Sequence, residues 1–281
     1  MKFAAILVSI VFGCSVAFAQ ADIRNVDFNN FTYLPSCAGE EGTAQQKVTV
    51  KNGEFSSEKK MDDYVDRFYF KVYNIIYGDV TGDKKDDAVM LSVCNTGGTG
   101  NFTEGFVYSL RGDKPVLVAR IPGGDRADGG LRAVTIENGL IVIEANDGDR
   151  NSGACCPEGT ITQKVRVSGG KLLTVGTPVK RDLFPLQKVT FQKGTSGTTL
   201  KLTLPGGEGV RLSLVARAGQ MLSVSTSTDK VTARLLEEDD ATVTDDVSGI
   251  SAKLAKNGTY TIQLTNYEEG PVDVTVNIKI W

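Results

Sequence analysis

The feature that most constrains the fold is an alternation of apolar and polar residues on either side of a turn within residues 210–226 (VRLSLVARAGQMLSVST). A period of two places one side of the segment in a core and the other in water, which predicts a half-buried strand. Gly219 lies in the turn 217–220, where a tight reversal needs a flexible backbone. The alternation returns at 260–264 and at 272–278. The last third of the chain is therefore predicted to be a β-sandwich with little room for helix.

The middle of the chain shows the same pattern in shorter segments. Glycine-rich turns separate apolar runs at intervals of about eight to twelve residues, the spacing of an all-β domain rather than of alternating strands and helices. Residues 22–65 are polar and poorly periodic, so we expect an irregular segment there with a short strand at 47–50. The strands predicted beyond it are 87–94, 105–110, 116–121, 131–137, 140–145 and 160–167.

A chain of 281 residues is long enough for two modest domains. The boundary is predicted at residues 176–187 (GTPVKRDLFPLQ), because two prolines, a glycine and adjacent charges are typical of an exposed linker. This gives a cysteine-bearing domain at 22–175 and a β-sandwich at 188–281. The expected fold class is all-β, with an antiparallel β domain followed by a jelly-roll-like sandwich.

Residues 1–19 have the organisation of a secretory signal peptide. Lys2 gives a short basic region, an apolar run follows, and residues 17–19 (AFA) match the pattern that signal peptidase reads, so cleavage is expected near Ala19. The apolar run is too short to cross a membrane as a helix, and no transmembrane segment is expected. A lipoprotein signal ending at Cys14 is the less consistent alternative, because the residues before that cysteine fit a lipobox poorly. The protein is expected to be periplasmic or secreted.

The cysteine count agrees with export. Once Cys14 leaves with the signal peptide, Cys37, Cys94, Cys155 and Cys156 remain, an even number that predicts two disulfides in an oxidising compartment. A bond between neighbours is strained and rare, so we expect Cys155 and Cys156 each to bridge to Cys37 or Cys94. A cysteine metal site is the alternative, but zinc-ribbon spacing is absent.

The chain contains no histidine. This excludes Ser-His-Asp and Cys-His catalysis and histidine-ligated zinc. Carboxylate chemistry remains open, but no acidic pair in the sequence has a recognisable catalytic setting, so we expect a non-catalytic protein. The net charge is −3, or −4 without Lys2, which argues against nucleic acid as a partner.

One acidic stretch has the composition of a cation-binding loop. Asp79, Thr81, Asp83 and Asp87 place oxygen side chains at positions 1, 3, 5 and 9 of DVTGDKKDD, and calcium prefers several such oxygens around a tight turn. The stretch resembles the Asp-rich loops of FG-GAP-like β domains, which implies calcium as a possible cofactor. Lys84 stands where that family usually has glycine. The alternative is a polar hairpin turn without metal.

The second domain resembles the bacterial pre-peptidase C-terminal domain and its relative, the periplasmic inhibitor of goose-type lysozyme. Three segments carry the resemblance: VTF at 189–191 with Gly194 and Ser196, RAGQ at 217–220 with Leu222 and Val224, and Leu254 with GTYTI at 258–262.

In the inhibitor family a Ser-Gly-x-Tyr loop enters the substrate cleft of the lysozyme. The resemblance implies that role for Asn257, Gly258, Thr259 and Tyr260, with asparagine replacing the serine. The alternative is structural: Gly258 makes a turn and Tyr260 faces the core, as tyrosines do in ordinary sandwiches.

Two functional hypotheses follow. The first is a non-catalytic exported binding protein that inhibits a lysozyme through residues 257–260. The second is a calcium-stabilised adhesion module whose partner is a carbohydrate or another surface, such as a cell-envelope glycan.

Overall fold

The computed structural model describes residues 21–38, 46–126, 129–149, 156–237, 239, 241–246 and 249–281. The fold is all-β, as predicted, with sheets that are antiparallel except for one parallel pair. Two 3-10 turns, η1 (Ile23–Asn25) and η2 (Phe28–Asn30), precede the strands. None of the described helices is long and apolar enough to cross a membrane.

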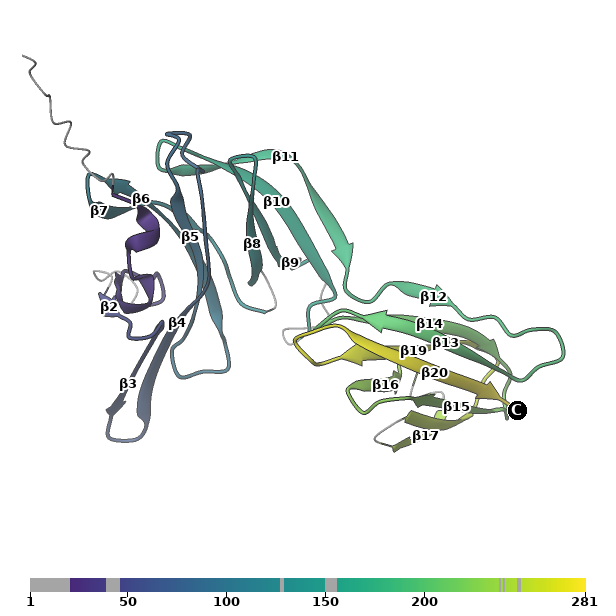
Figure 1. Ribbon diagram of the computed structural model, residues 1–281. Helices are drawn as coiled ribbons and strands as arrows, with labels where there is room; N and C mark the ends of the chain where they lie inside the picture. The colour runs from purple at the N-terminus through teal and green to yellow at the C-terminus, as the bar shows by residue number, and fades with distance from the viewer. Residues whose placement is uncertain are drawn as a thin grey trace, which may run out of the picture.

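The N-terminal region, residues 21–182, contains two large sheets (Figure 1). The first sheet has the order β3-β4-β5-β6-β7, formed by β3 (Glu54–Lys60), β4 (Val65–Gly78), β5 (Asp87–Asn95), β6 (Phe102–Arg111) and β7 (Lys114–Ile121). The second has the order β11-β10-β9-β8, formed by β8 (Leu131–Glu137), β9 (Leu140–Asn146), β10 (Gly159–Ser168) and β11 (Lys171–Asp182). The six strands predicted between residues 87 and 167 are confirmed as β5 to β10, with small differences at their ends.

The centre of the first sheet is buried on both faces, and β5 shows this most clearly. Ala88 and Met90 belong to a core beneath the N-terminal segment, whereas Val89 and Leu91 belong to a core against the second sheet. A strand that is covered on both sides reads as a nearly continuous apolar run, which explains the sequence DAVMLSVC. Figure 1 shows the purple N-terminal segment on one side of β5 and strands β8 to β11 on the other.

The segment expected to be irregular is part of a core. Strands β1 (Thr32–Tyr33) and β2 (Val48–Thr49) pair with each other and lie over the first sheet with η1 and η2. Tyr33 is fully buried, and its hydroxyl donates to the carbonyl of Phe28 at 2.7 Å. Its ring packs against those of Phe31, Phe70, Phe106 and Tyr108. Aromatic rings spaced along a polar sequence therefore provide the contacts that alternation did not show.

The C-terminal sandwich, residues 186–281, consists of two facing sheets. One has the order β12-β14-β19-β16, formed by β12 (Leu186–Lys188), β14 (Gly209–Ala216), β16 (Val231–Leu235) and β19 (Gly258–Asn266). The other has the order β13-β20-β15-β18-β17, formed by β13 (Gly197–Leu204), β15 (Met221–Thr226), β17 (Ala241–Asp246), β18 (Gly249–Leu254) and β20 (Val272–Ile280). The alternation that predicted these strands fills one shared core, which includes Leu212, Leu222, Ile262 and Val276.

Strand replaces most of the linker predicted at 176–187. β11 pairs with β10 as far as Asp182, and Leu183 is buried. The register shifts between Thr162 and Lys164, so Gly176 and Pro178 lie in a bulge on β11. Gly176 has a φ of +76°, and proline there gives up no ladder hydrogen bond. The glycine and proline that suggested a linker therefore mark a β-bulge.

Ion pairs join the two parts of the chain. The Arg211 guanidinium donates to both carboxylate oxygens of Glu158, at 2.6 and 3.3 Å, and Arg181 donates to both oxygens of Glu208, at 2.6 and 2.8 Å. The amide of Leu183 also donates to the carbonyl of Glu158 at 2.8 Å. Paired arginine–carboxylate forks have a defined geometry, so these contacts orient the sandwich on the end of β11.

The buried tyrosines predict a loss of stability at alkaline pH. Burial raises the pKa of Tyr108 to about 12 and raises that of Tyr33 further. The pKa of an unfolded tyrosine is about 10, so the contribution of each buried tyrosine to the free energy of unfolding should be constant below that pH. It should fall by about 1 kcal/mol per buried tyrosine near pH 11. Chemical denaturation from pH 8 to 12, read beside tyrosinate absorbance, tests this. A Tyr33→Phe variant should show a smaller loss, and titration of all tyrosines near pH 10 in the folded protein would contradict the prediction.

Candidate functional site

The segment predicted to inhibit a lysozyme runs from the turn after β18 into β19, which begins at Gly258. Asn257, Gly258 and Thr259 are exposed, but Tyr260 is only 2% exposed and belongs to the sandwich core. The Tyr260 hydroxyl donates to the carbonyl of Lys256 at 2.9 Å and accepts from its amide at 3.2 Å. A side chain held in this way supports the loop from below and does not present its ring to a partner. The structural role is therefore the one this geometry favours for Tyr260.

A second turn supports the same loop. Asn257 Oδ1 accepts a hydrogen bond from the amide of Ala218 at 2.9 Å, which ties the loop to the turn 217–220. Within that turn Gln220 Oε1 accepts from the amide of Arg217, and Gly219 has a φ of +85°, as predicted for a residue that must be flexible. We call residues 217–220 and 256–259 the loop end. Its two turns form one braced, solvent-exposed edge of the sandwich.

The acidic stretch at residues 79–87 folds into a turn that its own carboxylates hold. Asp87 is fully buried, and its Oδ2 accepts from the amides of Val80 and Thr81, both at 2.9 Å. Asp79 accepts from the amides of Gly82 and Lys84 at 2.6 and 2.8 Å. Lys84 has a φ of +65°, a left-handed backbone conformation that glycine adopts more readily than lysine.

These carboxylates do not assemble into a calcium cage. Asp87 Oδ1 and Thr81 Oγ1 are buried without a hydrogen-bond partner, which leaves two oxygens available. Across the described residues, however, no three His, Cys, Asp or Glu side chains gather in a way that could hold a metal ion. Asp83 instead caps the amide of Lys85. The geometry fits the turn better than the metal site, and calcium binding stays a prediction.

The disulfide pairing differs from the one expected. Cys37 bonds to Cys94, so neither can bridge to Cys155 or Cys156, and that part of the prediction is wrong. The reason is that the N-terminal segment, which we call the covering segment, lies over the end of β5 and brings Cys37 and Cys94 together. Cys156 is also disulfide-bonded, whereas Cys155 lies outside the described residues. The predicted use of cysteines in disulfides is thus confirmed for three of them.

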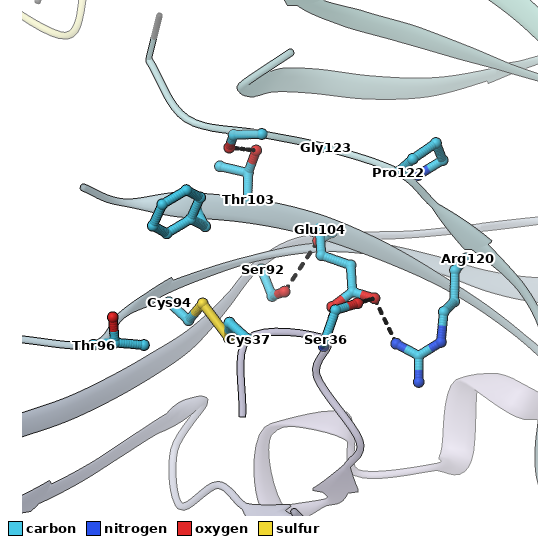
Figure 2. A pocket seen from close by; sticks show the side chains of 12 residues that line it. Ser36, Cys37, Ser92, Cys94, Thr96, Thr103, Glu104, Arg120, Pro122 and Gly123 are labelled. Carbon is cyan, nitrogen blue, oxygen red and sulfur yellow. Dashed lines mark hydrogen bonds and ion pairs between the residues drawn. A yellow bond between two sulfur atoms is a disulfide. The ribbon is translucent and has the colours of Figure 1, made fainter. Parts of the chain in front are cut away.

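The sequence did not reveal a pocket of about 750 Å³ beside the Cys37–Cys94 disulfide. Figure 2 shows its walls, which come from the ends of β5, β6 and β7, the backbone of residues 122–124 and the covering segment. Phe102 lies at the pocket and is 45% exposed, an unusual setting for a ring of that size. Apolar surface therefore faces solvent in a concave site.

A fixed polar cluster forms one wall of this pocket. Glu104 Oε1 accepts from Ser36 Oγ at 2.6 Å and from Arg120 Nη1 at 2.5 Å, and Glu104 Oε2 accepts from the amide of Ser36 at 2.8 Å. The Glu104 side chain is only 13% exposed. Arg120 also lies over the ring of Phe106. Because these groups hold one another in place, they can orient a ligand.

The alternation of apolar and polar residues in β6 contained evidence of this polar cluster. In β6, Glu104 falls on the same face as Phe106 and Tyr108, which belong to the core. A charged residue on the apolar face of a strand needs a partner of opposite charge. Arg120 can provide it, because Arg120 lies opposite Phe106 in the neighbouring strand and Phe106 is two residues from Glu104. Neither residue was singled out, because the fold of the covering segment could not be foreseen.

Comparisons with known proteins leave the chain without a family. No protein-family description matches it, and no curated protein does. Among solved structures, the chain is similar to PliG of Aeromonas hydrophila, a periplasmic lysozyme inhibitor of g-type lysozyme, at 20% identity over 35% of this chain and 97% of that chain, with a TM-score of 0.30. A mutant of the Escherichia coli PliG aligns at 18% identity over 35% of this chain and 99% of that one, with a TM-score of 0.29.

A third structure, exo-β-1,3-galactanase from Phanerochaete chrysosporium, aligns at 10% identity over 82% of this chain and 79% of that one, with a TM-score of 0.20. Likenesses at such TM-scores support no conclusion about function, and the residues of the chain itself must provide the argument.

The buried carboxylate of the acidic turn leads to a test of its role. Asp87→Ala should lower the free energy of unfolding by roughly 2–4 kcal/mol, because the buried amide of Val80 and the partly buried amide of Thr81 would lose their acceptor. Asp83→Ala, at an exposed position with one capping bond, is the control and should cost about 0.5–1 kcal/mol.

Both variants should be unfolded by urea with calcium and with a chelator. If the turn needs no metal, the chelator leaves the stability of the unmodified chain unchanged. A chelator-induced loss that Asp83→Ala abolishes would instead establish a calcium site.

Proposed function

We propose that this chain is an exported, non-catalytic binding protein whose C-terminal sandwich binds a protein partner through the loop end. Lysozyme is the partner class implied by the sequence resemblance of residues 188–281. The contact residues in this proposal are Asn257, Gly258 and Thr259, which are exposed, while Tyr260 acts as their support.

The observation that carries the proposal is the hydrogen bond between Asn257 Oδ1 and the amide of Ala218. It braces two exposed turns against each other, and the buried hydroxyl of Tyr260 holds the base of the loop. A loop that is already ordered loses little conformational entropy on binding, so a small polar surface can still give useful affinity. Rigid turns of this kind suit insertion into the cleft of a partner enzyme.

Gly258 offers the cleanest test of this docking surface. A Cβ added there meets no atom within 4 Å, and its φ lies outside the left-handed region, so Gly258→Arg should fold normally. The arginine would project from the loop end into any docked partner. We expect inhibition of the responsive lysozyme to fall about 100-fold, equivalent to about 2.7 kcal/mol of binding free energy.

The assay uses the full mature chain against goose-, chicken- and invertebrate-type lysozymes. Gly270→Arg is the matched control, because Gly270 is equally open and lies in the loop before β20 at the other end of the sandwich. Truncation of Tyr260 is avoided, since removing a buried aromatic ring costs about 3–5 kcal/mol of stability and would confuse binding with folding. Equal inhibition by the two variants, or inhibition of no lysozyme by the unmodified chain, would reject the proposal.

The pocket beside Cys37 and Cys94 supports a second candidate function, binding of a cell-envelope glycan. Its exposed Phe102 ring offers an apolar platform, and the Glu104–Arg120 pair with Ser36 offers oriented polar groups. Sites that combine a concave apolar wall with a few fixed polar groups are the usual setting for small ligands.

Phe102→Ala should weaken binding of peptidoglycan fragments at least tenfold, or about 1.4 kcal/mol, in isothermal titration calorimetry. Tyr64→Ala is the control, because Tyr64 is an exposed aromatic residue that does not line the pocket. Equal losses in the two variants would show that the pocket is not the site, and the absence of binding by the unmodified chain would remove this candidate.

A further inference from the structure

The outer face of the five-stranded sheet in the C-terminal sandwich has an unusual composition. Its inner positions, including Leu222, Ala252 and Ile278, form the core, so the alternate positions point to solvent. The register sets these outer residues in rows across the strands: Met221 lies opposite Lys253, and Ser223 lies between Lys279 and Ser251. Figure 1 shows β20 and β15 side by side within this sheet.

Short polar side chains make up most of these rows. Thr199 donates to Asn277 Oδ1 across the strands at 2.8 Å, and no bulky residue separates this pair from the serines of β15. The hydroxyl and amide side chains of the face are Thr199, Thr203, Ser223, Ser225, Thr242, Thr244, Ser251, Thr275 and Asn277. A pleated surface lined with such groups is both a donor and an acceptor of hydrogen bonds along its whole length.

Three lysines lie among these hydroxyls. Lys201, Lys253 and Lys279 are exposed, and none of them forms an ion pair within the described part of the chain. Among the described side chains of this face the acidic one is Asp273, which accepts from Thr203 Oγ1 at 2.6 Å. Among its described side chains this face therefore carries more positive than negative charge, in a chain whose net charge is −3.

A tryptophan completes the face at the end where two of the lysines lie. The backbones of Trp281 and Met221 exchange two hydrogen bonds, of 2.8 and 3.1 Å, so Trp281 stands beside Met221 in the same row as Lys253. The Trp281 side chain is 60% exposed. An indole ring held at the edge of a polar surface is a stacking platform for a flat apolar face of a ligand.

We propose that this outer face binds an anionic polysaccharide. The lysines would neutralise carboxylate or sulfate groups, the rows of hydroxyls would exchange hydrogen bonds with sugar hydroxyls, and Trp281 would stack on a sugar ring. Nucleic acid fits less well, because the face has three lysines and a single aromatic ring, and a nucleic-acid site needs a larger basic footprint. The pocket near Phe102 lies in the N-terminal region, whereas Met221 directly follows the turn 217–220 of the loop end, so the face and the loop end adjoin. The polysaccharide proposal uses none of the loop-end side chains, so the lysine variant and Gly258→Arg test the two proposals separately.

The probe is polygalacturonate, titrated into the full mature chain at low and at moderate salt. The double variant Lys253→Gln/Lys279→Gln should bind at least tenfold more weakly and show a shallower dependence on salt, because fewer counterions are released. Trp281→Ala should weaken binding about fivefold without changing the salt dependence. Gly258→Arg should bind like the unmodified chain.

Two matched controls guard against general effects. Lys59→Gln/Lys60→Gln removes two exposed charges on β3, and Tyr267→Ala removes an exposed ring in the loop after β19; both should leave binding unchanged. Dextran, which is uncharged, should bind at least tenfold more weakly than polygalacturonate. The proposal is overturned if polygalacturonate does not bind, if the lysine variant binds normally, if dextran binds equally well, or if single-stranded DNA of equal charge binds more tightly.

Discussion

The burial of β5 on both faces is the constraint on which the N-terminal region depends. A strand with no exposed face needs a layer on each side, and the second layer is a segment with little regular structure of its own. Tyr33 and the Cys37–Cys94 bond hold that segment in place. Ser36 of that segment lines the pocket and donates to Glu104. The same segment therefore completes the core above β5 and forms one wall of the pocket.

The C-terminal sandwich separates structure from recognition in a simpler way. Alternation sends one set of side chains into a single core, and everything available to a partner lies on the outer faces or in the turns. Tyr260 illustrates the difference, because a residue at the start of a strand can belong to an exposed loop in sequence and to the core in space. Its hydroxyl satisfies the backbone of the loop, which is a structural role with a direct effect on how the loop is presented.

The alternation of apolar and polar residues correctly predicted the all-β fold and most of the strands. β3 was missed because its residues are nearly all exposed, and it is held by backbone pairing with β4 and by ion pairs such as Glu58–Arg67. β11 was missed because Gly176 and Pro178 in its bulge imitate a linker. Periodicity reports burial on one face, so it is silent about strands that bury neither face.

The candidate sites were less predictable, since they depend on segments that meet only in three dimensions. The carboxylates of the acidic turn could be read from the sequence, but their use as caps for Val80, Thr81 and Gly82 could not. The pocket joins Ser36 to Glu104, which are 68 residues apart. No local pattern contains such a pair, and the same holds for the row that brings Trp281 beside Met221.

The continuous strand β11 and the arginine forks at Glu158 and Glu208 have a consequence for partners with repeated binding groups. A flexible linker lets two modules search independently for sites at many separations. Here the joint fixes the spacing, so a second binding event on one chain would have a high effective concentration only for partners whose groups recur at the matching interval. The gain in affinity from binding at two sites would then depend on the repeat spacing of the ligand. Polymers whose repeat does not match the spacing set by the joint would bind through one site only.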